Sequence, residues 1–94
     1  MMQITIHRDG QTYTLQPAII DMAKRRVTLT ITWTEPNGEV RDCMCRVVSR
    51  WQCLLNYSSD PKSRTMIAER MGQFRIGLWD AAQQVLRAEN LARS

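Results

Sequence analysis

The chain has 94 residues, of which 44% are hydrophobic and 23% are charged, with only 3 prolines and 4 glycines. This length allows one small domain covering residues 1–94, and the composition excludes a disordered chain and an enzyme with a separate cofactor domain. The formal net charge is +4, and all the basic residues except Lys24 and Lys62 are arginines, which favour planar and bidentate contacts. No segment approaches the roughly 18 apolar residues of a membrane span or resembles a signal peptide, so we expect a cytoplasmic protein without a membrane partner.

The first predicted element is a β-hairpin. Two alternating runs, residues 4–7 and 12–15, flank Asp9 and Gly10, a dipeptide that favours a two-residue type I′ turn. Closing the hairpin there puts an apolar set on one face and a polar set on the other. The predicted pairs are Ile6 with Tyr13 and Ile4 with Leu15 on the apolar face, and His7 with Thr12 and Thr5 with Thr14 on the polar face.

A second hairpin is predicted around residues 35–38, Glu-Pro-Asn-Gly, after the alternating strand 27–34. A two-residue Asn-Gly turn would place charged residues on the apolar face, whereas a three-residue loop with a glycine bulge avoids this. We therefore predict the second register, which pairs Val27 with Val47, Leu29 with Cys45, Ile31 with Cys43 and Trp33 with Arg41.

Two segments carry weaker patterns. Residues 17–24 are too short for a helix and predict an ordered connection whose Ile19 and Ile20 lie under the sheet. After Ser49, residues 49–58 fit either a short helix capped by that serine or a continued strand.

The last predicted element is a long C-terminal helix starting at Asp60–Pro61, an N-cap residue followed by proline at the first helical position. Gly72 and Gly77 inside it suggest a bend or a close backbone approach. The core stripe recurs at steps of three and four: Ile67, Met71, Phe74, Leu78, Ala81, Val85, Ala88 and Ala92. The fold class is therefore α+β: a four-stranded antiparallel sheet of two hairpins with the helix packed on one face, with or without a short helix before it.

The sequence argues against an enzyme and against a metal or cofactor site. Cys43 and Cys45 share the predicted core face while His7, the one histidine, lies on the opposite face, so we expect buried thiols rather than metal ligands. No phosphate loop, dinucleotide motif or nucleophile elbow is present. A one-sided sheet of this size also has little room for a catalytic cleft.

The most informative feature is a second apolar stripe on the helix, because a helix on one sheet needs only one. The stripe has two interpretations. Either residues 51–57 fold back over Trp79 and Leu86, with Trp51, Leu54, Leu55 and Tyr57 as the cover, or a protein partner covers the stripe. Trp and Arg are enriched at interface hot spots. The predicted interface residues are Arg75, Ile76, Trp79, Gln83, Leu86 and Arg87.

We therefore expect a small interaction module that regulates or inhibits a larger complex by protein–protein binding, with a homodimer as one form of it. Compact domains without cofactors occur among regulators of phages and mobile elements, which is an analogy of size and character only. The alternative is a small basic nucleic-acid-binding protein that uses the Thr- and Arg-rich face of the sheet. Its predicted contacts are Arg8, Lys24, Arg25, Arg26 and Arg46.

Overall fold

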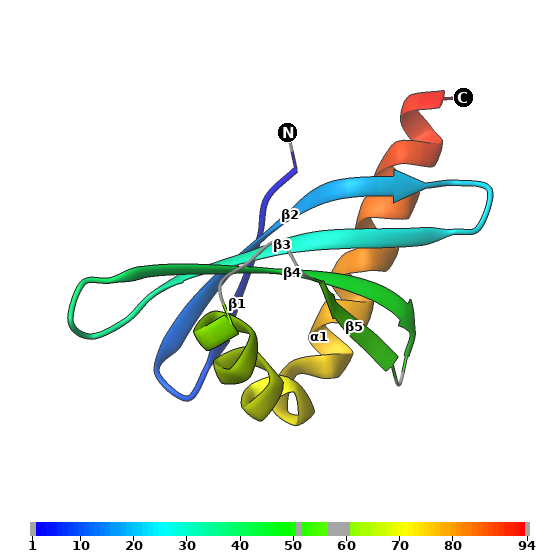
Figure 1. Ribbon diagram of the computed structural model, residues 1–94. Helices are drawn as coiled ribbons and strands as arrows, with labels where there is room; N and C mark the ends of the chain where they lie inside the picture. Colours follow the sequence, from blue (N-terminus) through cyan, green and yellow to red (C-terminus); the bar gives the residue numbers. More distant parts are fainter. Residues whose placement is uncertain (1, 51, 57–60, 94) are drawn as a thin grey trace.

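The computed structural model describes residues 2–50, 52–56 and 61–93, with side chains other than those of 55–56 and 70–76. It shows an antiparallel sheet with strand order β1-β2-β3-β4-β5, and a helix, α1, that lies against one face of it (Figure 1). The α+β class is confirmed, with five strands where four were predicted. The elements are β1 (Ile4–Arg8), β2 (Gln11–Asp21), β3 (Arg26–Thr34), β4 (Val40–Ser49), β5 (Gln52–Asn56) and α1 (Pro61–Arg93).

Both predicted hairpins are present in the predicted registers. Asp9 and Gly10 have φ of 50° and 76°, the left-handed conformation that a type I′ turn requires, and β1 pairs with β2 through Ile6↔Tyr13 and Ile4↔Leu15. In the second hairpin Gly38 has φ of 86° and its N–H donates to the carbonyl of Glu35. The pairs from Val27↔Val47 to Trp33↔Arg41 follow the three-residue loop.

The prediction for residues 17–24 is wrong, because β2 continues through them and pairs with β3 as far as Asp21↔Arg26. The register shifts between Pro17 and Ile19, so the strand contains a β-bulge, placed at a proline that cannot donate to the ladder. The extra residue reverses the alternation. Ile20 packs against the core, whereas Ile19 is 54% exposed on the other face, not under the sheet.

Residues 52–56 form β5, an edge strand that pairs antiparallel with β4, so this segment is a strand and not a helix, but the chain reverses after Ser49 instead of continuing β4. Val47 pairs with Cys53 and Arg46 pairs with Leu54, which puts Cys53 on the core face and Leu54 on the opposite face. Trp51 and Tyr57, which the fold-back interpretation invokes, lie outside the described residues.

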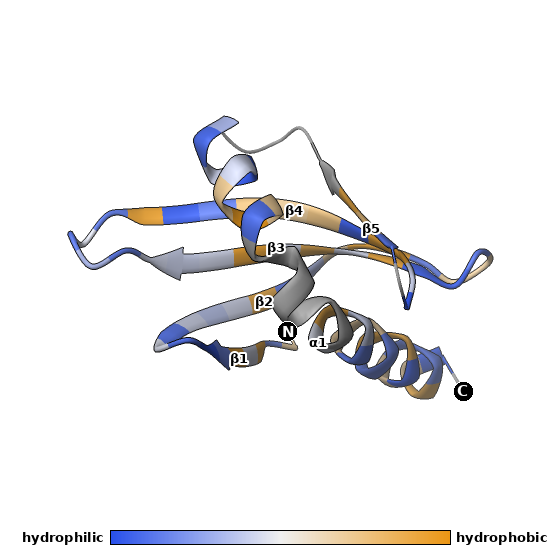
Figure 2. Cartoon of the chain, turned by 90° about the horizontal axis from the view of Figure 1, so that it is seen from below, coloured by the Kyte–Doolittle hydropathy of each residue, from blue (hydrophilic) through white to orange (hydrophobic). Residues whose placement is uncertain are grey.

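The helix begins at Pro61, as its start signal predicts. Figure 1 shows α1 as a first, shorter helical stretch and a longer one that run in different directions, so a bend occurs within it. A Cβ on Gly77 would lie 3.1 Å from Cδ1 of Ile6, which confirms the close approach expected at a helix glycine. Figure 2 shows hydrophobic residues recurring between hydrophilic ones along the longer stretch, the pattern of an amphipathic helix.

The core lies between α1 and the inner face of the sheet. From the predicted helix stripe, Ile67, Leu78, Ala81 and Val85 are buried, Ala88 is half-buried and Ala92 is exposed. The helix also buries Ala82 and Leu86, so its contact face is wider than one stripe. The strands contribute Tyr13, Leu15, Val27, Leu29, Ile31, Trp33, Cys43, Cys45 and Val47.

Candidate interaction surfaces

The helix residues predicted to form an interface differ in their exposure to solvent. Leu86 is 2% exposed and belongs to the core, so the interface prediction is wrong for this residue. Trp79 is partly buried and packs against the same core, Gln83 is half-buried and Arg87 is exposed. The side chains of Arg75 and Ile76 lie outside the described part of the chain. Of the described members of this set, Arg87 alone is exposed, which weakens the case for the helix as the docking surface.

The outer face of the sheet, opposite α1, carries the threonines of the alternating strands. On the described strands, exposed and half-buried apolar side chains lie among them: Ile19, Val40 and Leu54 are 54%, 67% and 45% exposed. The strand pairing joins Ile19 to Thr28, Thr28 to Arg46 and Arg46 to Leu54 in one row across β2, β3, β4 and β5. Exposed apolar side chains therefore stand at both ends of this row, while Arg46 within it is half-buried and Thr28 is buried.

Three of the five cations predicted to contact nucleic acid lie together. Lys24, Arg26 and Arg46 line one hollow of about 160 Å³ on the outer face, near the turn between β2 and β3. Arg25 occupies the same turn with φ of 53°. Arg8 ends β1 at the opposite end of the sheet, where it pairs with Gln11. The structure thus brings together four of the five residues and separates Arg8 from them.

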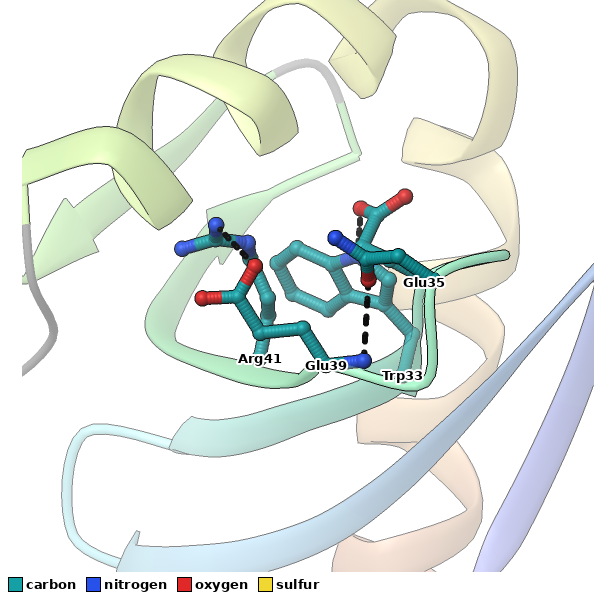
Figure 3. A network of polar contacts seen from close by, with 5 residues as sticks. Trp33, Glu35, Glu39 and Arg41 are labelled. Carbon is teal, nitrogen blue, oxygen red and sulfur yellow. Dashed lines mark hydrogen bonds and ion pairs between the residues drawn. The ribbon is translucent and has the colours of Figure 1, made fainter.

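A network of polar contacts lies at the edge of the core, beside the β3–β4 loop (Figure 3). The indole N–H of Trp33 donates to Oε1 of Glu35 at 2.6 Å, and the guanidinium of Arg41, 8% exposed, donates to Oε2 of Glu39 at 2.8 Å. The Tyr13 ring packs on Trp33 with 5.8 Å between centroids. Both carboxylates satisfy donors that are otherwise withdrawn from water, so this network has a structural explanation.

The three cysteines lie on the core side of β4 and β5, as the register predicts for Cys43 and Cys45. These two are buried and Cys53 is half-buried, and all three carry thiols rather than disulfide bonds. A hydrogen bond with the Cys53 thiol, and then burial, raises the pKa of Cys45 far above the usual value for cysteine. Among the described residues, no group of three His, Cys, Asp or Glu side chains is arranged to hold a metal ion. His7 is exposed on the outer face, with Nδ1 3.0 Å from Oγ1 of Thr12.

No family model, curated protein or solved structure matches the chain. Within the described residues, the helix is not apolar enough over a sufficient length to cross a membrane. Any functional assignment therefore depends on the surfaces described above.

Sequence reasoning missed Ile19 and Leu54 as surface residues, and it missed the hollow that gathers Lys24, Arg26 and Arg46. Two signals were available. Proline at position 17 inside an alternating run indicates a possible bulge, and the charged tetrapeptide Ala-Lys-Arg-Arg at 23–26 between two apolar runs is compatible with a hairpin tip.

Proposed function

We propose that this chain is a protein-binding module and that the outer face of its sheet is the surface that contacts the partner. The observation that carries the proposal is the solvent exposure of Ile19 and Leu54 in one cross-strand row. Single exposed apolar residues are common on protein surfaces, but interfaces concentrate apolar side chains inside a polar rim and are enriched in arginine.

The surroundings of these two residues match that arrangement. Met44, half-buried on β4, lies in the neighbouring row opposite Thr30, and Arg46 lies directly between the two apolar ends. Arg26 and Lys24 continue the charged side toward the β2–β3 turn. Charge complementarity therefore favours a partner that presents apolar side chains next to acidic ones.

The test uses substitutions that keep the propensity for β-structure. Ile19→Thr combined with Leu54→Thr removes the exposed apolar area, and because neither side chain is in the core we expect the melting temperature to stay within a few degrees. A tagged wild-type chain is cross-linked in host extract and its partner is identified by mass spectrometry. We expect the double variant to lose that partner.

Leu91→Gln is the matched control, because Leu91 is 74% exposed but lies on α1. It should retain the partner. The opposite pattern, with the partner lost in Leu91→Gln and retained in the double variant, would move the interface to the helix and refute the proposal. If light scattering shows a wild-type dimer that the double variant dissociates, the partner is a second copy of the chain.

Nucleic-acid binding remains a second candidate, favoured by the clustering of Lys24, Arg26 and Arg46 on the outer face. If these three side chains neutralise three phosphates, raising the salt from about 50 to 200 mM should weaken binding to a random duplex by about 40-fold. A duplex affinity that is insensitive to salt, or no binding at low salt, would exclude this candidate.

A further inference from the structure

The hollow between the β2–β3 turn and β4 is built by strand pairing rather than by one continuous sequence. Its lining residues are Ile19, Asp21, Lys24, Arg26, Thr28 and Arg46. Asp21 and Arg26 form the last pair of β2 and β3, and Thr28 pairs with Arg46 on β4. Arg26 and Arg46 are therefore diagonal neighbours on one face, a separation that long side chains can bridge. Two guanidinium groups from different strands can reach the same ligand.

The charges of the hollow do not balance. Lys24, Arg26 and Arg46 bring three positive charges and Asp21 brings one negative charge, a net of +2. The described chain offers no hydrogen bond or ion pair to the charged ends of the three cations, and one oxygen of Asp21 already accepts the backbone N–H of Lys24 at 3.0 Å. Like charges held on neighbouring strands repel one another, so a bound counter-ion would stabilise this arrangement.

The backbone of the turn gives a second, independent observation. Arg25 has φ of 53°, a conformation in which glycine or asparagine is ordinarily favoured, and its N–H donates to the carbonyl of Met22. This conformation is part of the chain reversal that places Lys24 and Arg26 on the same hollow. Arg25 itself is exposed in this turn and does not line the hollow.

We infer that this hollow binds a phosphate group or another dianionic oxyanion. Guanidinium groups match the oxygens of such an ion with paired N–H donors, and Lys24 supplies a further charge. The volume of about 160 Å³ leaves room for the ion and bound water. The phosphate could belong to a free phosphomonoester, which is a dianion, or to a nucleic-acid backbone, in which each phosphodiester carries one charge and two neighbouring groups would supply the same total. The inference does not depend on the protein-binding proposal.

The test is a titration of the isotope-labelled chain with inorganic phosphate, followed by NMR at constant ionic strength set with chloride. We expect saturable shifts at the backbone amides of Lys24, Arg26 and Thr28. Sulfate, also a dianion, should compete, whereas acetate should bind about tenfold more weakly because it carries one charge. Arg26→Ala and Arg46→Ala should each weaken phosphate binding by about tenfold or more, since each removes a charge-assisted hydrogen bond. Arg8→Ala, at the other end of the sheet, is the matched control and should leave the affinity unchanged.

A second arm identifies the source of the phosphate. A random duplex that binds more tightly than inorganic phosphate and is displaced by it assigns the hollow to a nucleic-acid backbone, and phosphate binding without duplex binding assigns it to a phosphomonoester. Absence of saturation at tens of millimolar phosphate overturns the inference, as does an affinity that Arg26→Ala and Arg46→Ala leave intact. All these substitutions leave Ile19 and Leu54 in place. Failure of the phosphate inference therefore does not affect the test of protein binding, which substitutes those two residues.

Discussion

Replacing Gly77 by alanine measures how closely α1 approaches β1. In the interior of a helix this change stabilises a protein by about 1 kcal/mol, because glycine loses more backbone entropy on folding. Here the new Cβ would lie 3.1 Å from Cδ1 of Ile6, inside ordinary van der Waals distance. That atom ends a flexible, half-buried side chain, which can move by a few tenths of an ångström at a cost of about 0.5–1 kcal/mol. We therefore expect Gly77→Ala to change the free energy of unfolding by less than about 0.5 kcal/mol.

The contact becomes measurable in a double-mutant cycle with Ile6→Val, which removes Cδ1. In that background Gly77→Ala should recover most of the helix-propensity gain, so the coupling between the two positions should be about 0.5–1 kcal/mol. Urea unfolding followed by circular dichroism on the four proteins gives this value. For a chain of this size 1 kcal/mol corresponds to a shift of about 4–8 °C in melting temperature, so thermal unfolding is a second measure.

Gly38→Ala is the control, because it changes the backbone conformational energy without introducing a contact with another residue. Gly38 has φ of 86° and nothing lies within 4 Å of its absent Cβ, so alanine there should destabilise through backbone strain and should not couple to Ile6→Val. Additive effects of Gly77→Ala and Ile6→Val would show that the two residues do not touch. A loss above about 1 kcal/mol for Gly77→Ala in both backgrounds would contradict a helical conformation at this position.

Three further substitutions test other features of the structure. Arg25→Gly relieves the left-handed strain and should raise the free energy of unfolding by about 1 kcal/mol, and destabilisation would contradict the turn geometry. Stability should fall as the pH rises above about 8.5, because the unfolded chain ionises Cys45 while the folded chain, whose Cys45 pKa is raised, keeps the proton. Stability against pH for Cys45→Ala should then be less steep by about 1.4 kcal/mol per pH unit. Leu86→Ala should lower the free energy of unfolding by about 2–5 kcal/mol, because Leu86 is in the core. A change near zero would show that Leu86 is not buried.

The registers of the two hairpins could be predicted from sequence because two independent features, the alternation of the strands and the turn residues, determine each register. Alternation decides which residues share a face, and the turn residues Asp9 with Gly10, and Gly38, decide where the strands reverse. The start of α1 at Pro61 was predicted for a similar reason, since its capping signal and its apolar spacing agree. Where two local signals agree, they determine the register of a hairpin or the start of a helix without information from tertiary contacts.

The other elements depend on contacts that the local sequence does not show. Strand β5 is short and lies at an edge, and its pairing with β4 determines its conformation. The second stripe on α1 was interpreted as surplus because one stripe per helix was assumed. The helix instead buries both Leu86 and Val85, because it packs on a sheet through a face wider than one stripe.

One inserted residue connects the fold to both candidate surfaces. Without the bulge after Pro17, strict alternation would put Ile19 and Asp21 on the core face with Pro17, and Ile20 would point to solvent. The bulge instead packs Ile20 against the core and turns Ile19 and Asp21 outward, where Asp21 is the cross-strand partner of Arg26. The same bulge therefore turns outward both Ile19, an apolar end of the cross-strand row, and Asp21, the acidic residue of the cationic hollow. A bulge that is needed to keep a carboxylate out of the core also creates the outer surface on which both proposals depend.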